Sequence, residues 1–268
     1  MKFSCLPYLM VNFSDEDAVR NWCQVAQRAG LDGIELMYRF PIHWHIVHRT
    51  EKLLKKHHLQ PSIITIHNCF MRQTSEGQKD ELNIVTSFLE LASALGAGMV
   101  RVIMGWWTPP IREISRASAL AAAITTIKMC LEPAARLKVV MALENHPGMG
   151  VSREMIHDVF SAVKSPFLGW NFDMENPYRI PGQDAFSFLN DPVIARRLCY
   201  VHAKNFKNTP KGWDQDIALD QGDLDVVSML AAVKRLGHDT WLSFEYASKD
   251  AKHIMRSARY LRKAWAKA

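Results

Sequence analysis

Short apolar runs alternate with longer stretches of helical periodicity along the whole chain. Eight of these runs are the right length and composition for strands, and they cover Phe3–Leu9, Gly33–Tyr38, Gln60–His67, Met99–Gly105, Val139–Glu144, Leu168–Asp173, Cys199–Ala203 and Thr240–Tyr246. Successive runs begin 27 to 41 residues apart, which leaves room for one helix in each gap. The pattern therefore predicts parallel strands joined by helices.

Helix boundary signals fall inside the gaps. Ser75-Glu76-Gly77-Gln78 has the form of a capping box, and Gly96 stands where that helix would end. No linker rich in Pro, Gly or Ser divides the chain, so we expect one domain over residues 1–268. Eight β–α units in about 250 residues are typical of a closed (β/α)8 TIM barrel. The first run ends in Tyr8-Leu9-Met10-Val11-Asn12, which lacks the glycines of a dinucleotide-binding sheet.

Composition narrows the class of protein. The chain has 268 residues, 48% of them hydrophobic, with a formal net charge of +6, which excludes a wholly disordered chain. Its longest charge-free apolar stretch, residues 117–127, is too short for a membrane span of about 20 residues. Five scattered cysteines without a CxxC pair argue against a disulfide framework or a thiolate zinc site. Without a long apolar signal region, a cytoplasmic location is expected.

Polar residues end the last four predicted strands. These residues are Glu144, Asp173, His202 and Glu245, and the carboxyl ends of barrel strands are where TIM barrels carry their active sites. Three converging carboxylates would repel one another unless a cation or nearby Lys and Arg side chains supplied counter-charge. One nitrogen and three oxygen ligands suit one divalent metal ion, Mn²⁺, Mg²⁺, Co²⁺ or Zn²⁺, and favour the harder ions.

The sequence around these residues resembles a known superfamily. The segments that carry the resemblance are Leu143-Glu144-Asn145-His146-Pro147-Gly148, Asn171-Phe172-Asp173, Val201-His202-Ala203-Lys204-Asn205 and Ser243-Phe244-Glu245. They resemble the xylose-isomerase-like TIM-barrel superfamily, and within it the sugar phosphate isomerase/epimerase branch. The resemblance implies that Glu144, Asp173, His202 and Glu245 are metal ligands. It also implies that Glu144 and Glu245 exchange protons with the substrate.

Further residues are candidates for substrate contact. The resemblance places His67 and Trp107, which follow the third and fourth strands, against the sugar. His146 and Lys204 are candidate acids or oxyanion donors beside the metal ligands. Asn176 stands where many members of the family have a histidine, and an amide can hydrogen-bond a hydroxyl but cannot titrate.

These residues predict a metal-dependent isomerase or epimerase in carbohydrate metabolism. Its substrate would be a small keto sugar or polyol that reacts through a metal-stabilised enediolate. If a leaving group lies β to the carbanion, the same site would act as a lyase or dehydratase. The resemblance also implies a homo-oligomer, and manganese is among the expected metals.

Two other classes of function remain open on the sequence alone. An AP-endonuclease-like hydrolase of DNA would suit the basic charge, but 102–107 contains no histidine for a metal cluster, so nucleic acid is not the expected partner. A non-catalytic sugar-binding subunit is the other alternative. Arg101 is expected to pair with Glu144 or Glu35 inside the fold. The histidines of 43–58 are expected on a helix surface, away from the carboxylates.

Overall fold

The computed structural model describes residues 1–7, 13, 15–105, 114–245 and 250–268. Contacts within the chain divide it into two compact units. The first unit comprises residues 1–62 and 200–268, and the second comprises residues 63–199. Each unit contributes four of the eight parallel strands, and the two are described in turn.

The first unit contains β1 (Lys2–Leu6), β2 (Gly33–Met37), β10 (Trp241–Glu245) and most of β7 (Leu198–Ala203). β10 pairs in parallel with β1 on one side and with β7 on the other, and β2 lies next to β1. The register sets Ser243 of β10 opposite both Ser4 of β1 and His202 of β7. Polar side chains of three strands therefore lie at one level.

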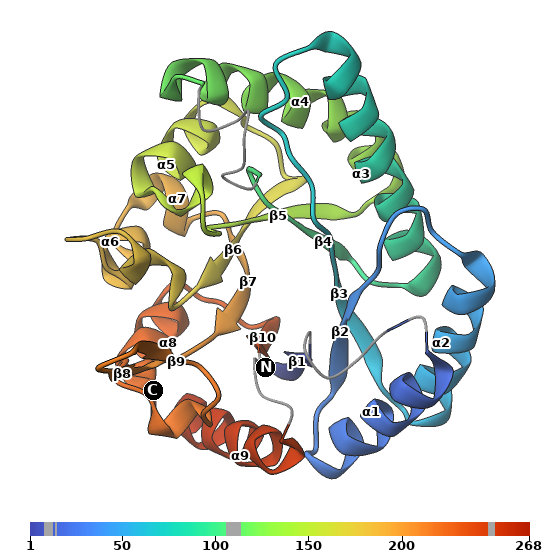
Figure 1. Ribbon diagram of the computed structural model, residues 1–268, viewed down its shortest axis with the longest axis vertical. Helices are drawn as coiled ribbons and strands as arrows, with labels where there is room; N and C mark the ends of the chain where they lie inside the picture. Colours follow the sequence, from blue (N-terminus) through green and yellow to red (C-terminus); the bar gives the residue numbers. More distant parts are fainter. Residues whose placement is uncertain (8–12, 14, 106–113, 246–249) are drawn as a thin grey trace. The chain divides into compact units, whose positions relative to one another are not determined.

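The helices of the first unit lie along one side of these strands (Figure 1). They are α1 (Glu16–Arg28), α2 (Trp44–Lys56), α8 (Val226–Arg235) and α9 (Ala251–Lys267). Each has an apolar face at helical spacing; α1, for example, buries Val19, Trp22, Cys23 and Ala26. A short antiparallel hairpin of β8 (Lys207–Thr209) and β9 (Gly212–Asp214), together with the 3₁₀ turn η4 (Leu219–Gln221), follows β7.

The second unit contains β3 (Gln60–Thr65, shared at its start with the first unit), β4 (Met99–Val102), β5 (Val140–Glu144) and β6 (Leu168–Asp173). These strands are parallel and adjacent in chain order. Helices α3 (Ser75–Leu95), α4 (Arg116–Leu137) and α5 (Arg153–Ala162) cover one side of them (Figure 1). The remaining elements are short: α6 (Ala185–Leu189), α7 (Pro192–Ala195) and the 3₁₀ turns η2 (Met149–Val151) and η3 (Asn176–Arg179).

All eight predicted strands are present, with shifts at their ends. The predicted third and fourth strands extend too far, because the apolar runs continue into the turns that follow Thr65 and Val102. The capping prediction for α3 is wrong by one residue: the side chain of Thr74, rather than Ser75, accepts the Gly77 amide. Gly96 ends α3 in the left-handed conformation, as predicted.

None of the described helices is long and apolar enough to cross a membrane. All five cysteines are described, and all five are free thiols.

Gly33, the first residue of β2, is fixed by close packing. A Cβ atom there would lie 2.3 Å from the Gln60 carbonyl oxygen and 2.7 Å from the Trp241 ring. We expect Gly33→Ala to reduce the free energy of unfolding by about 1–3 kcal/mol, because the backbone must shift to accept the methyl group. Gly98→Ala is the control, since nothing lies within 4 Å of its added Cβ. Urea unfolding of both variants checks this, and equal stabilities would contradict it.

Candidate functional site

Glu144 is the last residue of β5, and its carboxylate is paired with the buried side chain of Arg101. Its side chain is fully buried, and its Oε2 lies 2.5 Å from Nε of Arg101, a β4 residue that is itself 3% exposed. Arg101 also donates a hydrogen bond from Nη1 to the Ile66 carbonyl, 2.9 Å away. Arg101 thus supplies counter-charge to the carboxylate and ties it to the segment that follows β3. The pairing with Glu144 is the structural role expected for Arg101.

Asp173 is the last residue of β6, and backbone amides hold one of its carboxylate oxygens. Its Oδ1 accepts hydrogen bonds from the amides of Glu175 and Asn176, at 2.9 and 2.8 Å. The side chain of Asn145 accepts from the Asp173 amide and donates to the Asp173 carbonyl, both at 2.9 Å. These bonds fix the main chain on both sides of the carboxylate and so set the direction of its side chain.

The side-chain amide of Asn176, which follows β6 in the second unit, lies close to the Glu144 carboxylate. Its Nδ2 is 3.4 Å from Glu144 Oε1, and the side chain is 1% exposed. Its Oδ1 is buried and has no hydrogen-bond partner among the described residues. A buried acceptor without a partner costs free energy. Asn176 therefore keeps a buried acceptor that no described residue uses. The neighbouring candidate His146 is 9% exposed, and its Nδ1 lies 3.2 Å from the Pro147 carbonyl.

His202 and Glu245 lie close together in the first unit. His202, on β7, is fully buried, and its Nδ1 is 3.7 Å from Oε2 of Glu245, the last residue of β10. Its other ring nitrogen, Nε2, lies 3.0 Å from an oxygen of Glu35 on β2. Lys204 Nζ is 3.0 Å from Glu245 Oε1, and both side chains are about one-tenth exposed. The sequence prediction did not connect Glu35 with His202.

The four predicted metal ligands form one group. One ligand atom from each of Glu144, Asp173, His202 and Glu245 lies within 4.8 Å of the others. Oxygen and nitrogen atoms about 2.0–2.6 Å from a divalent cation are separated from one another by distances of this order. Three carboxylates and an imidazole are ligand types that divalent cations accept, and a divalent ion would offset most of the negative charge of the three carboxylates, so the residues present fit a divalent metal. Among the described residues, no other group of this kind is found.

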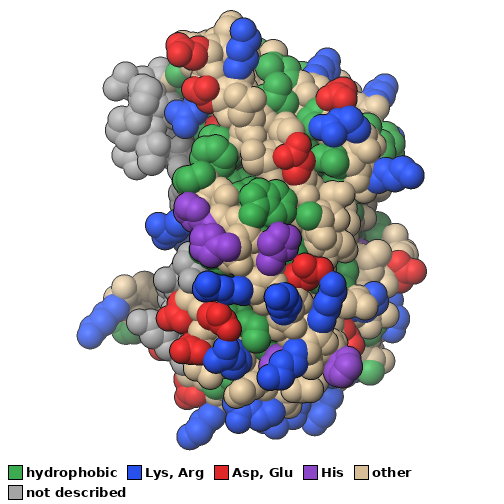
Figure 2. Space-filling view, turned by 90° about the vertical axis from the view of Figure 1, so that its right-hand side faces the viewer, with side chains coloured by type: hydrophobic (Ala, Val, Ile, Leu, Met, Phe, Trp, Pro, Cys, Tyr) green, Lys and Arg blue, Asp and Glu red, His purple; other side chains and the backbone are tan. Residues whose placement is uncertain are grey.

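The remaining candidates from the sequence are His67, Trp107 and the histidines of 43–58. His67 follows β3 and is exposed. Trp107 lies outside the described residues. The histidines at positions 43, 45 and 48 are exposed at the start of α2. In the view of Figure 2, histidine side chains lie on the surface near lysines and arginines. They are not among the four residues of the possible metal-binding group found in the described part of the chain.

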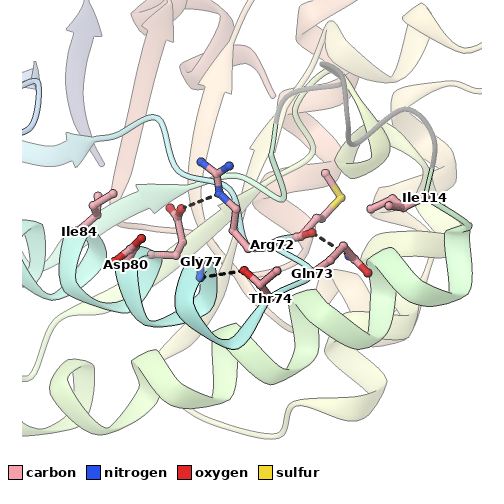
Figure 3. A pocket seen from close by; sticks show the side chains of 9 residues that line it. Arg72, Gln73, Thr74, Gly77, Asp80, Ile84 and Ile114 are labelled. Atoms are coloured by element: carbon pink, nitrogen blue, oxygen red, sulfur yellow. Dashed lines mark hydrogen bonds and ion pairs between the residues drawn. The ribbon is translucent and has the colours of Figure 1, made fainter.

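A pocket of about 470 Å³ lies at the start of α3 in the second unit (Figure 3). It is lined by both polar and apolar side chains, including Arg72, Gln73, Asp80 and Ile84. At its edge, the buried carboxylate of Glu81 accepts the Cys69 amide at 2.7 Å, with Arg72 Nε 3.7 Å away.

Asn68 fixes the same segment from the β4 side. Its side chain exchanges two 2.8 Å hydrogen bonds with the backbone of Ile103. The Glu81 and Asn68 bonds together hold the turn that follows His67.

Comparison with known proteins identifies the family and the fold of the chain. The family model described as xylose isomerase-like TIM barrel matches residues 23–264. No curated protein sequence matches the chain.

Solved structures agree with that family match. A D-tagatose 3-epimerase-like protein is 17% identical, with a TM-score of 0.83 over 99% of this chain and 97% of that one. D-allulose 3-epimerase from Methylomonas sp., solved with D-allulose, is 17% identical, with a TM-score of 0.80 over 98% and 96%. The IolI protein, solved with a zinc atom, is 16% identical, with a TM-score of 0.79 over 100% and 99%. The predicted (β/α)8 barrel is confirmed.

The Arg101–Glu144 pair gives a stability prediction. Arg101→Met would leave a buried carboxylate without its cation, so we expect a loss of about 3–5 kcal/mol in the free energy of unfolding. The double variant Arg101→Met, Glu144→Gln should recover much of that loss, because no uncompensated charge remains. Urea unfolding in the presence of a chelator isolates the pair from metal binding. A double variant no more stable than Arg101→Met would contradict this account.

Glu81 gives a prediction of pH dependence. Burial raises the pKa of the Glu81 carboxyl above its usual value, against the opposing effects of the Cys69 amide and Arg72. An acid whose pKa is raised by folding makes the fold less stable as pH increases from its unfolded pKa through its folded one. Glu81→Gln, whose side-chain oxygen can still accept the Cys69 amide, should therefore be more stable than the wild type at pH 7. Thermal unfolding between pH 4 and 8 should show that advantage vanishing in acid; a constant difference would refute it.

Proposed function

The chain belongs to the xylose isomerase-like TIM barrel family, and from that premise we propose that it is a divalent-metal-dependent isomerase or epimerase of a small keto sugar or polyol. The observation that carries the proposal is the group formed by Glu144, Asp173, His202 and Glu245, with ligand atoms within 4.8 Å of one another. All four are at or next to the carboxyl ends of parallel strands, where barrel enzymes carry their chemistry.

The ligand chemistry supports Mn²⁺, Mg²⁺, Co²⁺ or Zn²⁺, with three oxygens favouring the harder ions. The related IolI structure contains zinc. When bound, such a cation would supply a Lewis acid that stabilises negative charge developing on substrate oxygens.

Proton transfer is assigned to Glu144 and Glu245. One carboxylate removes the proton from the carbon next to a substrate carbonyl, and the other, as a carboxylic acid, returns a proton to carbon. Transfer by two groups on opposite faces inverts the carbon, which is epimerisation. Arg101 and Lys204 supply counter-charge to the two carboxylates, at 2.5 and 3.0 Å.

The polar residues around the group are assigned to substrate binding. Asn176 offers a buried acceptor without a partner among the described residues, which suits a sugar hydroxyl. Lys204, His146 and His67 are the other described candidates, and Trp107 completes the set proposed from the sequence. A keto sugar is favoured as substrate because one solved relative contains bound D-allulose.

The decisive experiment combines metal content with solvent exchange. Protein loaded with Mn²⁺ or Zn²⁺ and then dialysed should retain about one ion per chain. With a panel of keto sugars in D₂O, it should incorporate deuterium at the carbon next to the carbonyl. Glu245→Gln should lose about 10²–10⁴-fold in turnover and hold the metal more weakly. Glu81→Gln, which alters a buried carboxylate outside the ligand group, is the matched control.

The outcomes separate the possible reactions. A product that has lost water would show that the site catalyses elimination rather than isomerisation. Full turnover and full metal content in Glu245→Gln would mean that the assigned site is wrong. Absence of any bound ion after loading would remove the proposal altogether.

A further inference from the structure

We propose that Glu35 is a positioning residue that fixes the tautomer and the orientation of His202, so that Nδ1 of His202 is the nitrogen offered to the metal. This inference rests on the proposed function, because it concerns the same metal site. Glu35 itself is not one of the four grouped ligands.

Glu35 is a buried carboxylate in the middle of an apolar strand. Its side chain is 0% exposed, and both neighbours in β2, Ile34 and Leu36, are core residues. Removing a carboxylate from water is costly unless several donors surround it. A residue of this kind in the core needs a role that an apolar side chain could not fill.

Three donors from two neighbouring strands converge on this carboxylate. His202 Nε2 lies 3.2 and 3.0 Å from its two oxygens. The Ser243 hydroxyl donates to Oε2 at 3.0 Å, and the Tyr200 hydroxyl donates to the same oxygen at 3.4 Å. The strand register explains the convergence, because Ser243 of β10 is paired with His202 of β7.

Tyr200 is itself held in place as a donor. Its hydroxyl lies 2.8 Å from the Ser62 hydroxyl and 3.1 Å from that of Ser4. These hydrogen bonds link the Glu35 carboxylate through Tyr200 to Ser62 and Ser4.

A carboxylate can only accept hydrogen bonds, and this decides the tautomer of His202. Nε2 must carry the hydrogen that Glu35 accepts, which leaves the lone pair of a neutral ring on Nδ1. Nδ1 is the atom on the Glu245 side, 3.7 Å from Oε2. Without Glu35, the ring could place its hydrogen on Nδ1 and donate it to Glu245. That arrangement would block two ligand atoms at once.

Two variants of Glu35 test this role with the full chain. Glu35→Leu removes the acceptor, whereas Glu35→Gln keeps an oxygen that can accept from Nε2 but removes the charge. We expect Mn²⁺ or Zn²⁺ affinity, measured by competition with a chelator, to fall about 100-fold for Glu35→Leu and about 10-fold for Glu35→Gln. Tyr200→Phe, which leaves the Glu35–His202 bond in place, should change affinity much less.

A spectroscopic readout separates positioning from general loss of structure. In metal-free protein with ¹⁵N-labelled histidine, the nitrogen shifts of His202, assigned by comparison with His202→Asn, should report hydrogen on Nε2 in the wild type. Glu35→Gln should preserve that tautomer, and Glu35→Leu should lose it. If Glu35→Leu does not fold, the wild-type tautomer and the affinity of Glu35→Gln still decide the question.

Failure of this inference differs from failure of the proposed function. Hydrogen on Nδ1 in the wild type, or unchanged metal affinity in both Glu35 variants, would overturn the role of Glu35 while leaving the metal site intact. Equal metal binding by the wild type and Glu245→Gln would instead overturn the metal site. Because the tautomer of His202 is measured in metal-free protein, that result does not depend on whether the protein binds a metal.

Discussion

The interaction on which the candidate site depends is the compensation of charge on carboxylates buried at strand ends. Glu144 and Asp173 are fully buried, and a buried ionised carboxylate without a partner would cost more free energy than a domain has to spare. The groups that compensate the negative charge differ between the two carboxylates. Arg101 supplies a full positive charge to Glu144, whereas Asp173 Oδ1 accepts hydrogen bonds from the backbone amides of Glu175 and Asn176. A divalent cation would complete the compensation where these partners fall short.

The partners of these carboxylates also determine how rigid the site is. The groups that hold these carboxylates come from regular elements or from the turns directly after them: Arg101 from β4, the Glu175 and Asn176 amides from the turn after β6, and Ser243, which holds Glu35, from β10. A ligand set held in this way loses little conformational entropy when a metal binds, since its side chains are already ordered. Preorganisation of this kind is what distinguishes a metal site from an accidental cluster of acidic residues.

The sequence predicted the strands and the four ligand candidates because both depend on patterns within single segments. An apolar run that ends in a carboxylate is visible without knowledge of its neighbours, as for Glu144 and Asp173. The bond from His202 to Glu35 was missed because it joins strands far apart in the sequence and depends on register, which one strand does not reveal. The hairpin of β8 and β9 was missed because its three-residue strands carry no apolar alternation.

The fold does not determine the substrate, because TIM barrels catalyse many different reactions. The solved relatives are only 16–17% identical to this chain, so the likeness to them establishes the shared fold alone. Selectivity must then come from residues that contact substrate without holding the metal. Asn176 is the clearest of these, because its amide stands where a titrating histidine is common in the resembled family and because its oxygen is buried without a partner among the described residues. An amide fixes a hydroxyl without exchanging its proton. Under the proposed function, proton transfer is therefore assigned to Glu144 and Glu245, and Asn176 is assigned to recognition of the hydroxyl pattern.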